Sequence, residues 1–404
     1  MNPKLRPHEA HWIEHNGRPA ILLRDRGGLS DHAVVVPQPL VVLLSLCDGT
    51  RDVATLRTAF ELRTGVRVEA SMIDHVLDQL DEALLLDTPR AEKVEAQALE
   101  KYRSASFRPQ AGADLSYPSD SAELGRMLHG YLAAASPDGG KQFATPIRGL
   151  ISPHIDFQRG GNIYAATWRL AADAVRAADV AVVFGTDHTG GPGEITLTRQ
   201  NYATPYGALP TARYAVDAVA EAIGQHAAFA SELNHVKEHS IELAAIWLHH
   251  FLGTSSCELV PILCGSFQPF TDGLQNPAEF EKFALLVGAL RESLRGKRTL
   301  VVAAADLAHV GLAFGDSYAF GQGEKEALAR ADADLLAAAA SGDAEAFIKP
   351  LVAEADRRRV CGLPPIYLAL RLMGDARGCL VDYAQCPADQ NDASWVSIAG
   401  MVFS

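Results

Sequence analysis

The amino-acid sequence predicts an α/β fold, in which a central, largely parallel sheet is flanked by helices and a small α+β domain precedes it. Apolar runs of strand length occur at 149–152, 180–186 and 299–305, and small residues bound each of them. Such runs are typical of strands buried on both faces. Helical stretches such as 165–178 alternate with the runs, whereas the first 88 residues show shorter, differently ordered elements.

The first 88 residues predict two paired strands, then helices, then a closing strand. Turn residues separate the elements, and apolar residues at helical spacing mark the helices. In chain order, the predicted features are strands at 19–23 and 33–36 joined by a turn at Arg26-Gly27-Gly28, an apolar run at 41–46, a helix at 53–62 with Thr50 as its N-cap, a helix from about Ser71 and a strand at 84–86.

Beyond this small domain the chain changes composition twice. Residues 91–108 are charged and rich in alanine, which predicts an exposed helix supported by pairs of opposite charge one turn apart. A loop with proline, glycine and serine follows at 109–121. We therefore predict three parts, namely a domain at 1–88, a helical linker at 89–112 and a second domain at 113–404.

Composition excludes several classes of protein. The formal net charge of −13 argues against a nucleic-acid binder, because phosphate contacts need a basic surface. The six cysteines are scattered, as in proteins of a reducing compartment. The N-terminus lacks the apolar segment of a signal peptide, and no run reaches the roughly 18 apolar residues of a membrane span. We expect a soluble cytoplasmic protein that binds neither nucleic acid nor a membrane.

Histidines follow the predicted strands of the second domain. His154, His188 and His309 each come shortly after an apolar run, and His239 lies in a fourth segment of this kind. Because ligands bind beyond the carboxyl ends of parallel strands, we expect these imidazoles to meet at one edge of the sheet, with Asp187 and Asp306 beside them. The chain has no Cys-x-x-Cys pair, so an open histidine and carboxylate site for Fe(II) or another divalent ion is favoured over a structural zinc cage.

The second domain resembles Memo-like proteins in the order and spacing of its motifs. The resemblance spans residues 113–404, and the Glu-His-Ser-Ile-Glu segment is its most specific part. The matching segments are Ser152-Pro153-His154-Ile155-Asp156-Phe157, Phe184-Gly185-Thr186-Asp187-His188, Glu238-His239-Ser240-Ile241-Glu242, Val260-Pro261-Ile262-Leu263, Asp306-Leu307-Ala308-His309, Cys361-Gly362 and Tyr383-Ala384-Gln385.

This resemblance implies a fold similar to class III extradiol dioxygenases and a pocket of three histidines and one cysteine. Carried over, His154 and His188 are metal ligands, and His239 is a third ligand or an acid/base residue. The family's cysteine corresponds to position 308, but this chain has alanine there, so that thiol is missing. His239, Asp306, Asp187 or His309 would then complete a shell for Fe(II), zinc or manganese; a pocket that has lost its metal is the alternative.

The same reasoning gives expectations for the residues around this shell. His239, Asp306 and His309 are the candidate catalytic residues, and a cysteine introduced at position 308 is expected to tighten metal binding. Cys361 is interpreted as a structural thiol. Glu242 lies three residues after His239, so it is a ligand, a group that orients the imidazole or an acceptor for backbone donors.

The N-terminal segment resembles the PqqD-like fold, a small winged-helix relative that binds peptides. Leu46-Cys47-Asp48-Gly49-Thr50-Arg51-Asp52-Val53 and the stretch 77–85 carry this resemblance. The first ninety residues hold ten basic and thirteen acidic side chains, which disfavours DNA. A peptide would add to the edge of the hairpin between Ile21 and Val36.

Two functions are therefore predicted. The first is a non-heme metal-dependent oxidoreductase with a dioxygenase-like pocket and an unknown small-molecule substrate, coupled to peptide recognition. The alternative is a non-enzymatic binding or accessory protein for a peptide-modifying radical-SAM system, with a peptide or a radical-SAM protein as its partner.

Overall fold

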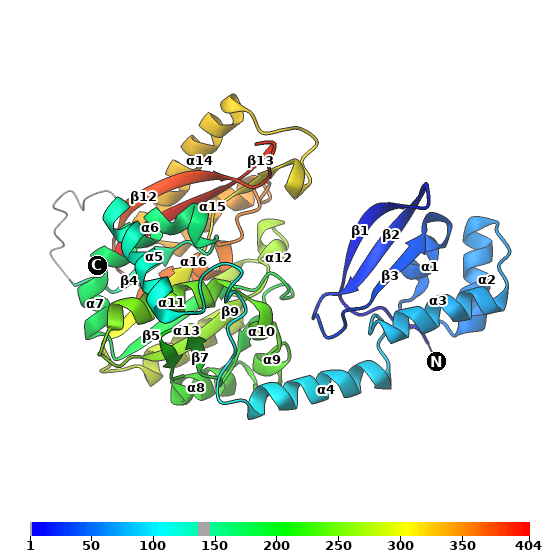
Figure 1. The fold of residues 1–404 in the computed structure, drawn as a ribbon, viewed down its shortest axis with the longest axis horizontal. Coiled ribbons are helices and arrows are strands. Elements are labelled where there is room, and N and C mark those ends of the chain that lie inside the picture. The colour runs from blue at the N-terminus through cyan, green and yellow to red at the C-terminus, as the bar shows by residue number, and fades with distance from the viewer. Residues whose placement is uncertain (1, 136–145) are drawn as a thin grey trace. The chain divides into compact units, whose positions relative to one another are not determined.

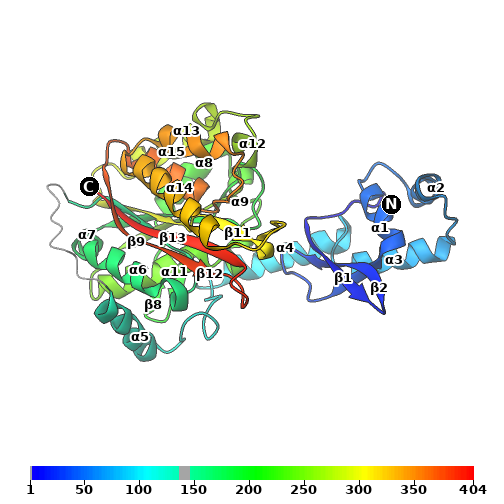
Figure 2. The same ribbon diagram turned by 90° about the horizontal axis from the view of Figure 1, so that it is seen from above.

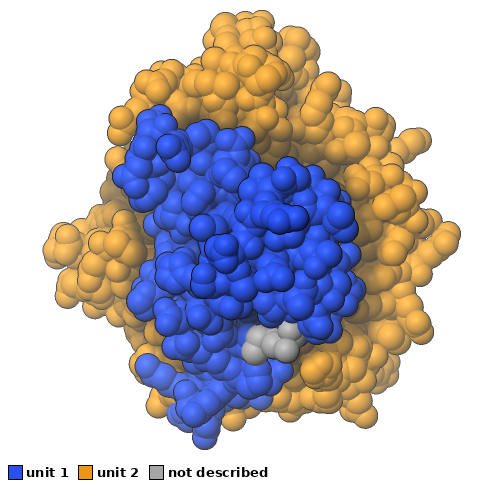
Figure 3. Space-filling model, turned by 90° about the vertical axis from the view of Figure 1, so that its right-hand side faces the viewer, with its two compact units in different colours: residues 1–104 blue, residues 105–404 orange. Residues whose placement is uncertain are grey.

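The computed structural model describes residues 2–135 and 146–404. Their contacts divide the chain into two compact units, residues 1–104 and 105–404, which Figure 3 colours separately. Each unit has its own buried core. Each is therefore described by itself.

The N-terminal unit contains a small antiparallel sheet in the order β1-β2-β3, followed by helices (Figure 1). The predicted pairing of two strands is confirmed, because β2 pairs antiparallel with β3. Its elements are β1 (His8–His15), β2 (Arg18–Asp25), β3 (Ala33–Pro37), the 3-10 helix η1 (Gln38–Leu40), α1 (Val41–Leu46), α2 (Val53–Thr64), α3 (Ala70–Glu82) and α4 (Pro89–Ser104).

Two expectations for this unit are wrong. Helix α2 is capped by Asp52, whose carboxylate accepts a hydrogen bond from the Thr55 amide, and not by Thr50. The predicted closing strand at 84–86 contributes an isolated bridge from Leu86 to Leu5 instead. The winged-helix likeness stays a prediction.

Helix α4 packs with the N-terminal unit. Arg6 and Glu95 form an ion pair of 2.7 Å, and Ala91 is fully buried. The unit therefore includes the helix that the sequence pattern assigned to the linker.

The second unit is built on one large sheet with a parallel centre, as the sequence predicted. Strands β4, β10, β5 and β9 are parallel neighbours, and antiparallel strands flank them. In spatial order the strands are β11 (His309–Gly311), β13 (Ser394–Phe403), β4 (Gly149–Ser152), β10 (Thr299–Ala304), β5 (Val180–Thr186), β9 (Glu258–Cys264) and β6 (Ile195–Leu197), with β12 (Gly378–Pro387) beside β13; β7 (Tyr202–Thr204) and β8 (Gly207–Leu209) form a separate hairpin.

Helices cover both faces of this sheet, as Figure 2 shows. One layer consists of α5 (Ser121–Ala134), α6 (Phe157–Leu170), α7 (Ala172–Ala177) and α11 (Ser240–Leu252). The other layer contains α8 (Arg213–Ile223), α9 (Gln225–Phe229), α12 (Gln268–Thr271), α13 (Glu281–Ser293), α14 (Gln322–Ala340), α15 (Ala344–Ala353) and α16 (Leu363–Met373). The remaining helical segments are α10 (Asn234–Lys237), η2 (Pro277–Glu279) and η3 (Leu312–Phe314).

Alternate residues of the central strands fill the two cores. In β5, Val182 and Phe184 point into one core, and Ala181 and Val183 into the other. Burying a side chain of valine or phenylalanine size contributes about 1.5–3 kcal/mol. Because these strands are buried on both faces, their sequences are continuously apolar. The polar residues of a site therefore lie at the strand ends.

Among residues 2–135 and 146–404, no helix combines the length and the apolar character that crossing a membrane requires.

Candidate metal centre

The predicted site residues meet where β4, β5 and β10 end. His154 follows β4, His188 follows β5, and Asp306 follows β10. Because these three strands are parallel neighbours, their carboxyl ends lie along the same edge. His239 joins them from the turn that precedes α11.

Three imidazoles form the centre of the cluster. The ring centroid of His154 lies 5.1 Å from that of His188 and 5.6 Å from that of His239, and the last two are 5.2 Å apart. His154 is buried, whereas the other two side chains are open to solvent. The cluster is therefore buried on the side of His154 and accessible to solvent on the side of His188 and His239.

A cavity of about 530 Å³ lies in front of the cluster. Five of the residues that the sequence singled out line it: His154, His188, His239, Asp306 and His309. Asp187 does not line it, and its carboxylate accepts hydrogen bonds from the Thr189 amide and the Asn234 side chain instead. Ile155, Leu243, Phe314 and Val396 are among its apolar residues. The cavity can hold a small molecule against the imidazoles.

Two of the three imidazoles are held by hydrogen bonds of their Nδ1 atoms, and the third lies close to a carboxylate. His154 Nδ1 lies 3.0 Å from the carbonyl oxygen of Ala304, and His188 Nδ1 lies 2.9 Å from the Glu238 carboxylate. His239 Nδ1 is 3.3 Å from the other oxygen of the same carboxylate. An imidazole that donates from Nδ1 offers Nε2 as its ligand atom, and such anchored rings are typical of metal-binding histidines.

Glu238 is a site residue that sequence reasoning did not single out. Its carboxylate also accepts hydrogen bonds from the backbone amides of His188, His239 and Ser240, at 3.1, 2.8 and 2.9 Å. Burial alone would raise its pKa, but the hydrogen bond and charge of His188, with His239, hold the pKa below its usual range. The ionised carboxylate of Glu238 therefore connects the residue that follows β5 with the residues that begin α11.

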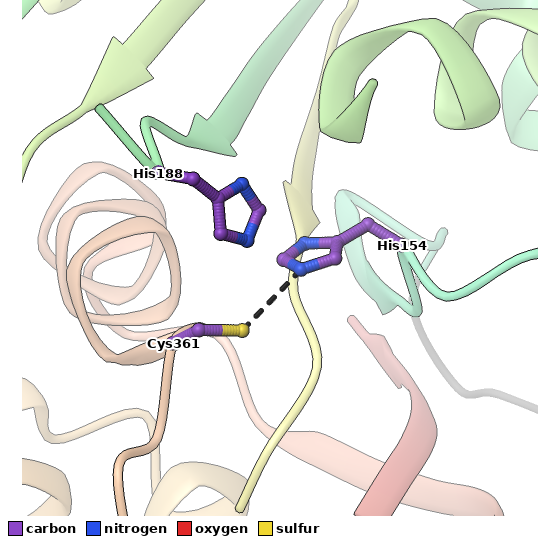
Figure 4. Close-up of side chains that lie close together, drawn as sticks. All are labelled: His154, His188 and Cys361. Carbon is purple, nitrogen blue, oxygen red and sulfur yellow. Dashed lines mark hydrogen bonds between the residues drawn. The ribbon is translucent and has the colours of Figure 1, made fainter. Parts of the chain in front are cut away.

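Cys361 brings a thiol to the cluster from an unexpected position. Its Sγ atom lies 3.3 Å from His154 Nε2, and the ligand atoms of His154, His188 and Cys361 all lie within 4.8 Å of one another (Figure 4). The expectation that alanine at position 308 leaves the pocket without a thiol is therefore wrong. Ala308 is buried in a separate apolar cluster with Val310 and Phe320.

The spacing of these atoms and their chemistry fit a single ion. Zinc binds histidine nitrogen at about 2.0–2.1 Å and cysteine sulfur at about 2.3 Å, so two ligands of one ion lie about 3–4.5 Å apart. A second set of ligand atoms, from His188, Glu238 and His239, also lies within 4.8 Å. His188 belongs to both sets.

Asp306 and His309 lie beside the cluster in different ways. The Asp306 carboxylate accepts hydrogen bonds from the His154 and Ile155 amides at 2.8 and 3.1 Å, and its other oxygen is 3.7 Å from His154 Nε2. His309 Nδ1 is 3.2 Å from the carbonyl oxygen of Leu307. Asp306 thus fixes the loop that carries His154, and His309 forms part of the cavity wall.

Burial and charge tune the protonation of the centre. Burial, with the neighbouring His188 and His239, lowers the pKa of His154 to about 3, so this imidazole is neutral at pH 7. For His188, burial acts to lower the pKa, but the hydrogen bond and charge of Glu238 outweigh it and the pKa is raised. Burial raises the pKa of Asp306. Neutral imidazole is the form that binds metal.

A second hollow of about 370 Å³ also borders the centre. His188 and Cys361 line it together with polar residues such as Asp356 and Arg359. Three residues that line this hollow have a strained backbone. Ala355, Asp356 and Arg359 all have positive φ angles, of 49°, 45° and 52°. Such strain in non-glycine residues gathers at functional sites.

Comparison with known proteins agrees with this architecture. The sequence profile of the family described as Memo-like protein matches residues 108–402. The chain belongs to the Memo-like family. The family match covers the large sheet, both helical layers and every residue of the centre described above.

Several relatives carry the description MEMO1 family protein. That of Aquifex aeolicus is 26% identical over 388 residues, which is 95% of either chain. That of Thermus thermophilus is 28% identical over 320 residues, or 78% of this chain and 88% of the relative. That of Methanosarcina acetivorans is 26% identical over 251 residues, or 61% and 82%. The likeness to the Aquifex protein therefore extends beyond the Memo-like part into the N-terminal unit.

Proposed function

We propose that this Memo-like protein is a metal-dependent oxidoreductase that acts on a small molecule in the cavity of about 530 Å³. One observation carries the proposal: three imidazoles, two of them held through Nδ1, and one thiol converge beside a cavity, at the edge where parallel sheets bind ligands. This placement also supports the likeness to class III extradiol dioxygenases.

In this proposal His154, His188 and Cys361 hold a divalent ion. The mixed nitrogen and sulfur set suits Fe(II) or zinc, and manganese less well because it prefers oxygen. The ion would supply Lewis acidity and, if it is iron, electron transfer. Because three protein ligands leave a coordination position open, the set suits a catalytic site better than a structural one.

His239 is the residue best placed to move a proton. Its ring is open to the cavity, and the Glu238 carboxylate lies 3.3 Å from Nδ1. Burial has the largest effect on the pKa of His239, and this pKa is lowered. The ring is therefore neutral at pH 7 and accepts a proton from a bound molecule. Asp306 and His309 border the same cavity and would contact that molecule.

Metal content of protein purified without chelators tests the proposal. We expect about one divalent ion per chain by elemental analysis, and a His154→Ala/His188→Ala variant should lose it while keeping its circular dichroism spectrum. A His249→Ala variant is the matched control, because His249 bonds Thr204 away from the centre. A metal-free wild-type protein that also takes up no added Fe(II) or zinc would contradict the proposal.

We propose a second role for the N-terminal unit, as a peptide-binding accessory of a radical-SAM system. In its described sheet, β3 is an edge strand, and a hollow of about 430 Å³ lies between β3 and α3. An extended peptide can add to such an edge through main-chain hydrogen bonds. This arrangement supports the PqqD-like likeness.

Amide chemical shifts of the full chain, recorded with a precursor peptide encoded beside its gene, test this second role. We expect shifts confined to β3 and α3. Shifts in β1 alone, or none at millimolar peptide, would contradict it.

A further inference from the structure

One arginine lies entirely inside the second unit, next to the turn that carries His239. Arg108 has no exposed surface. Its Nε donates to the carbonyl oxygen of His235 at 2.7 Å, and its Nη2 donates to the carbonyl oxygen of Glu238 at 2.6 Å. Its Nη1 pairs with the buried carboxylate of Glu242. The guanidinium therefore contacts three points of the segment 235–242.

Glu242 in turn fixes the segment from which Arg108 comes. Its carboxylate accepts hydrogen bonds from the amides of Ala111 and Gly112 at 2.9 and 2.8 Å, and from the Tyr117 hydroxyl. Of the three roles left open for Glu242, the structure therefore favours the acceptor for backbone donors. Added bulk at Gly112 would come within 3.0 Å of the Tyr117 ring and 3.2 Å of Glu242. The two segments are thus closely packed, and the Glu242 carboxylate accepts hydrogen bonds from both backbone and side-chain donors.

Glu238 connects this buried ion pair to the histidine cluster. Its carbonyl oxygen is held by Arg108, and its carboxylate holds His188 Nδ1 and lies beside His239 Nδ1. A shift of the Glu238 backbone would therefore move both imidazoles. Arg108 itself donates to none of the ligand atoms.

We propose that Arg108 is a positioning residue of the metal centre, which fixes Glu238 so that His188 and His239 point their Nε2 atoms at one place. This inference rests on the proposed function. Groups that orient the ligands of a metal site typically change affinity tenfold to a hundredfold when they are removed. Arg108 differs from such orienting groups because it bonds the backbone carbonyl oxygen of Glu238 and does not bond a metal ligand directly.

The geometry requires arginine. The planar guanidinium directs rigid donors in different directions, whereas the lysine ammonium is a compact point charge. A lysine at position 108 would keep the charge that Glu242 needs but could not reach both carbonyl oxygens in the same way. Arg108→Lys therefore separates the positioning role from the simple presence of a positive charge.

The test compares two lysine variants of buried arginines in the full-length chain. Arg358 is the matched control, because its side chain pairs with Asp332 at 2.6 Å and Glu354 at 2.7 Å and bonds no residue of the cluster. We expect Arg108→Lys to weaken zinc binding tenfold to a hundredfold in a competition assay and to change the visible spectrum of the Co(II) form. Arg358→Lys should leave both unchanged, although it also removes guanidinium contacts to two carboxylates.

An Arg108→Met/Glu242→Met variant covers the case in which Arg108→Lys does not fold. Replacing a buried ion pair by apolar residues of similar volume is often tolerated, and it removes the donors to Glu238. Zinc affinity and a Co(II) spectrum equal to those of the wild type in either folded variant would overturn the inference. A wild-type chain that binds no metal would instead refute the proposed function.

Discussion

At the scale of single residues, the hydrogen bonds on Nδ1 determine which nitrogen His154 and His188 offer to an ion. Ala304 holds His154 from β10, and Glu238 holds His188 from the turn before α11. The same contacts keep the rings from rotating, so less conformational freedom is lost when an ion binds. Cys361 then adds a negative charge, since a thiolate and not a thiol binds metal.

The thiol provides a direct test at this scale. Cys361→Ala should weaken zinc binding at least tenfold, because one ligand and its charge are removed. Ala308→Cys should leave the affinity unchanged, because position 308 faces an apolar cluster with Val310 and Leu328. Competition with a chromophoric chelator measures both variants. A tighter Ala308→Cys variant would show that this position reaches the ion after all.

A buried histidine outside the centre makes stability depend on pH. His235 accepts the Tyr202 hydroxyl at 2.6 Å on Nδ1 and donates to the Thr196 carbonyl at 3.1 Å from Nε2, and burial lowers its pKa to about 3. Below pH 6.5 the unfolded chain therefore binds a proton that the folded chain excludes. The free energy of unfolding should fall by about 1.4 kcal/mol per pH unit between pH 6.5 and 3 from this residue alone.

Urea unfolding of metal-free protein at pH 7.5 and 5 measures this dependence. A His235→Gln variant should show a smaller loss between the two pH values, whatever its absolute stability. An equal loss in both proteins would mean that His235 is not the group responsible.

At this scale the sequence identified the histidines but not all of their partners. His154 and His188 could be predicted because they follow apolar strands, and His239 because of its motif. Cys361 follows no strand; it precedes α16, and only the packing of that helix against β10 and β5 brings its sulfur to the cluster. Glu238 acts through contacts 50 residues away in sequence, which no local pattern reveals.

At the scale of elements, the centre depends on how closely α11 approaches β5. Gly185 permits this approach, because a side chain there would come within 2.5 Å of Ile241 and 2.6 Å of the Ser240 hydroxyl. Ser240 also donates to the Thr186 carbonyl at 3.0 Å, which ties the first turn of α11 to the strand that ends before His188.

Gly185→Ala tests this packing. The added methyl group should push α11 from the sheet and cost about 1–3 kcal/mol of unfolding free energy, as overpacked cores do. Because Glu238, which holds His188, lies in the turn before α11, zinc affinity should fall as well. Gly288→Ala is the control, since the space around Gly288 is open. Equal stability of the two variants would contradict the close packing.

Elements with a clear apolar period were the ones that the sequence located. Strand β5 and helix α3 lie where the pattern predicted them. Strand β1 was missed because its sequence, HEAHWIEH, has few apolar residues and its side chains are mostly exposed at a sheet edge. The cap of α2 was misplaced because Thr50 and Asp52 both suit an N-cap, and only the backbone decides between them.

At the scale of the whole molecule, two units with separate cores share one chain. The core of the N-terminal unit draws only on residues of that unit, among them Leu23, Phe60 and Leu80. The connection out of helix α4 leads directly to Arg108 and hence to the buried ion pair beside the centre. The sequence pattern changes near residue 88, whereas the two units divide after residue 104, because helix α4 packs with the N-terminal unit.

A fragment of residues 2–104 should therefore fold alone. We expect one cooperative urea transition and, because acidic side chains outnumber basic ones in the first ninety residues, no salt-sensitive binding of DNA. Circular dichroism and a DNA mobility shift at two salt concentrations measure these properties. An unfolded fragment would mean that its core needs the second unit.

The central claim is that a thiol and imidazoles share one ion. X-ray absorption spectroscopy of the zinc-loaded full-length protein tests it most directly, because it counts the sulfur and nitrogen neighbours of the metal. We expect one sulfur at about 2.3 Å with nitrogen at about 2.0–2.1 Å, and the loss of that sulfur in Cys361→Ser. A shell of only nitrogen and oxygen in the wild-type protein, or a sulfur that persists in Cys361→Ser, would contradict it.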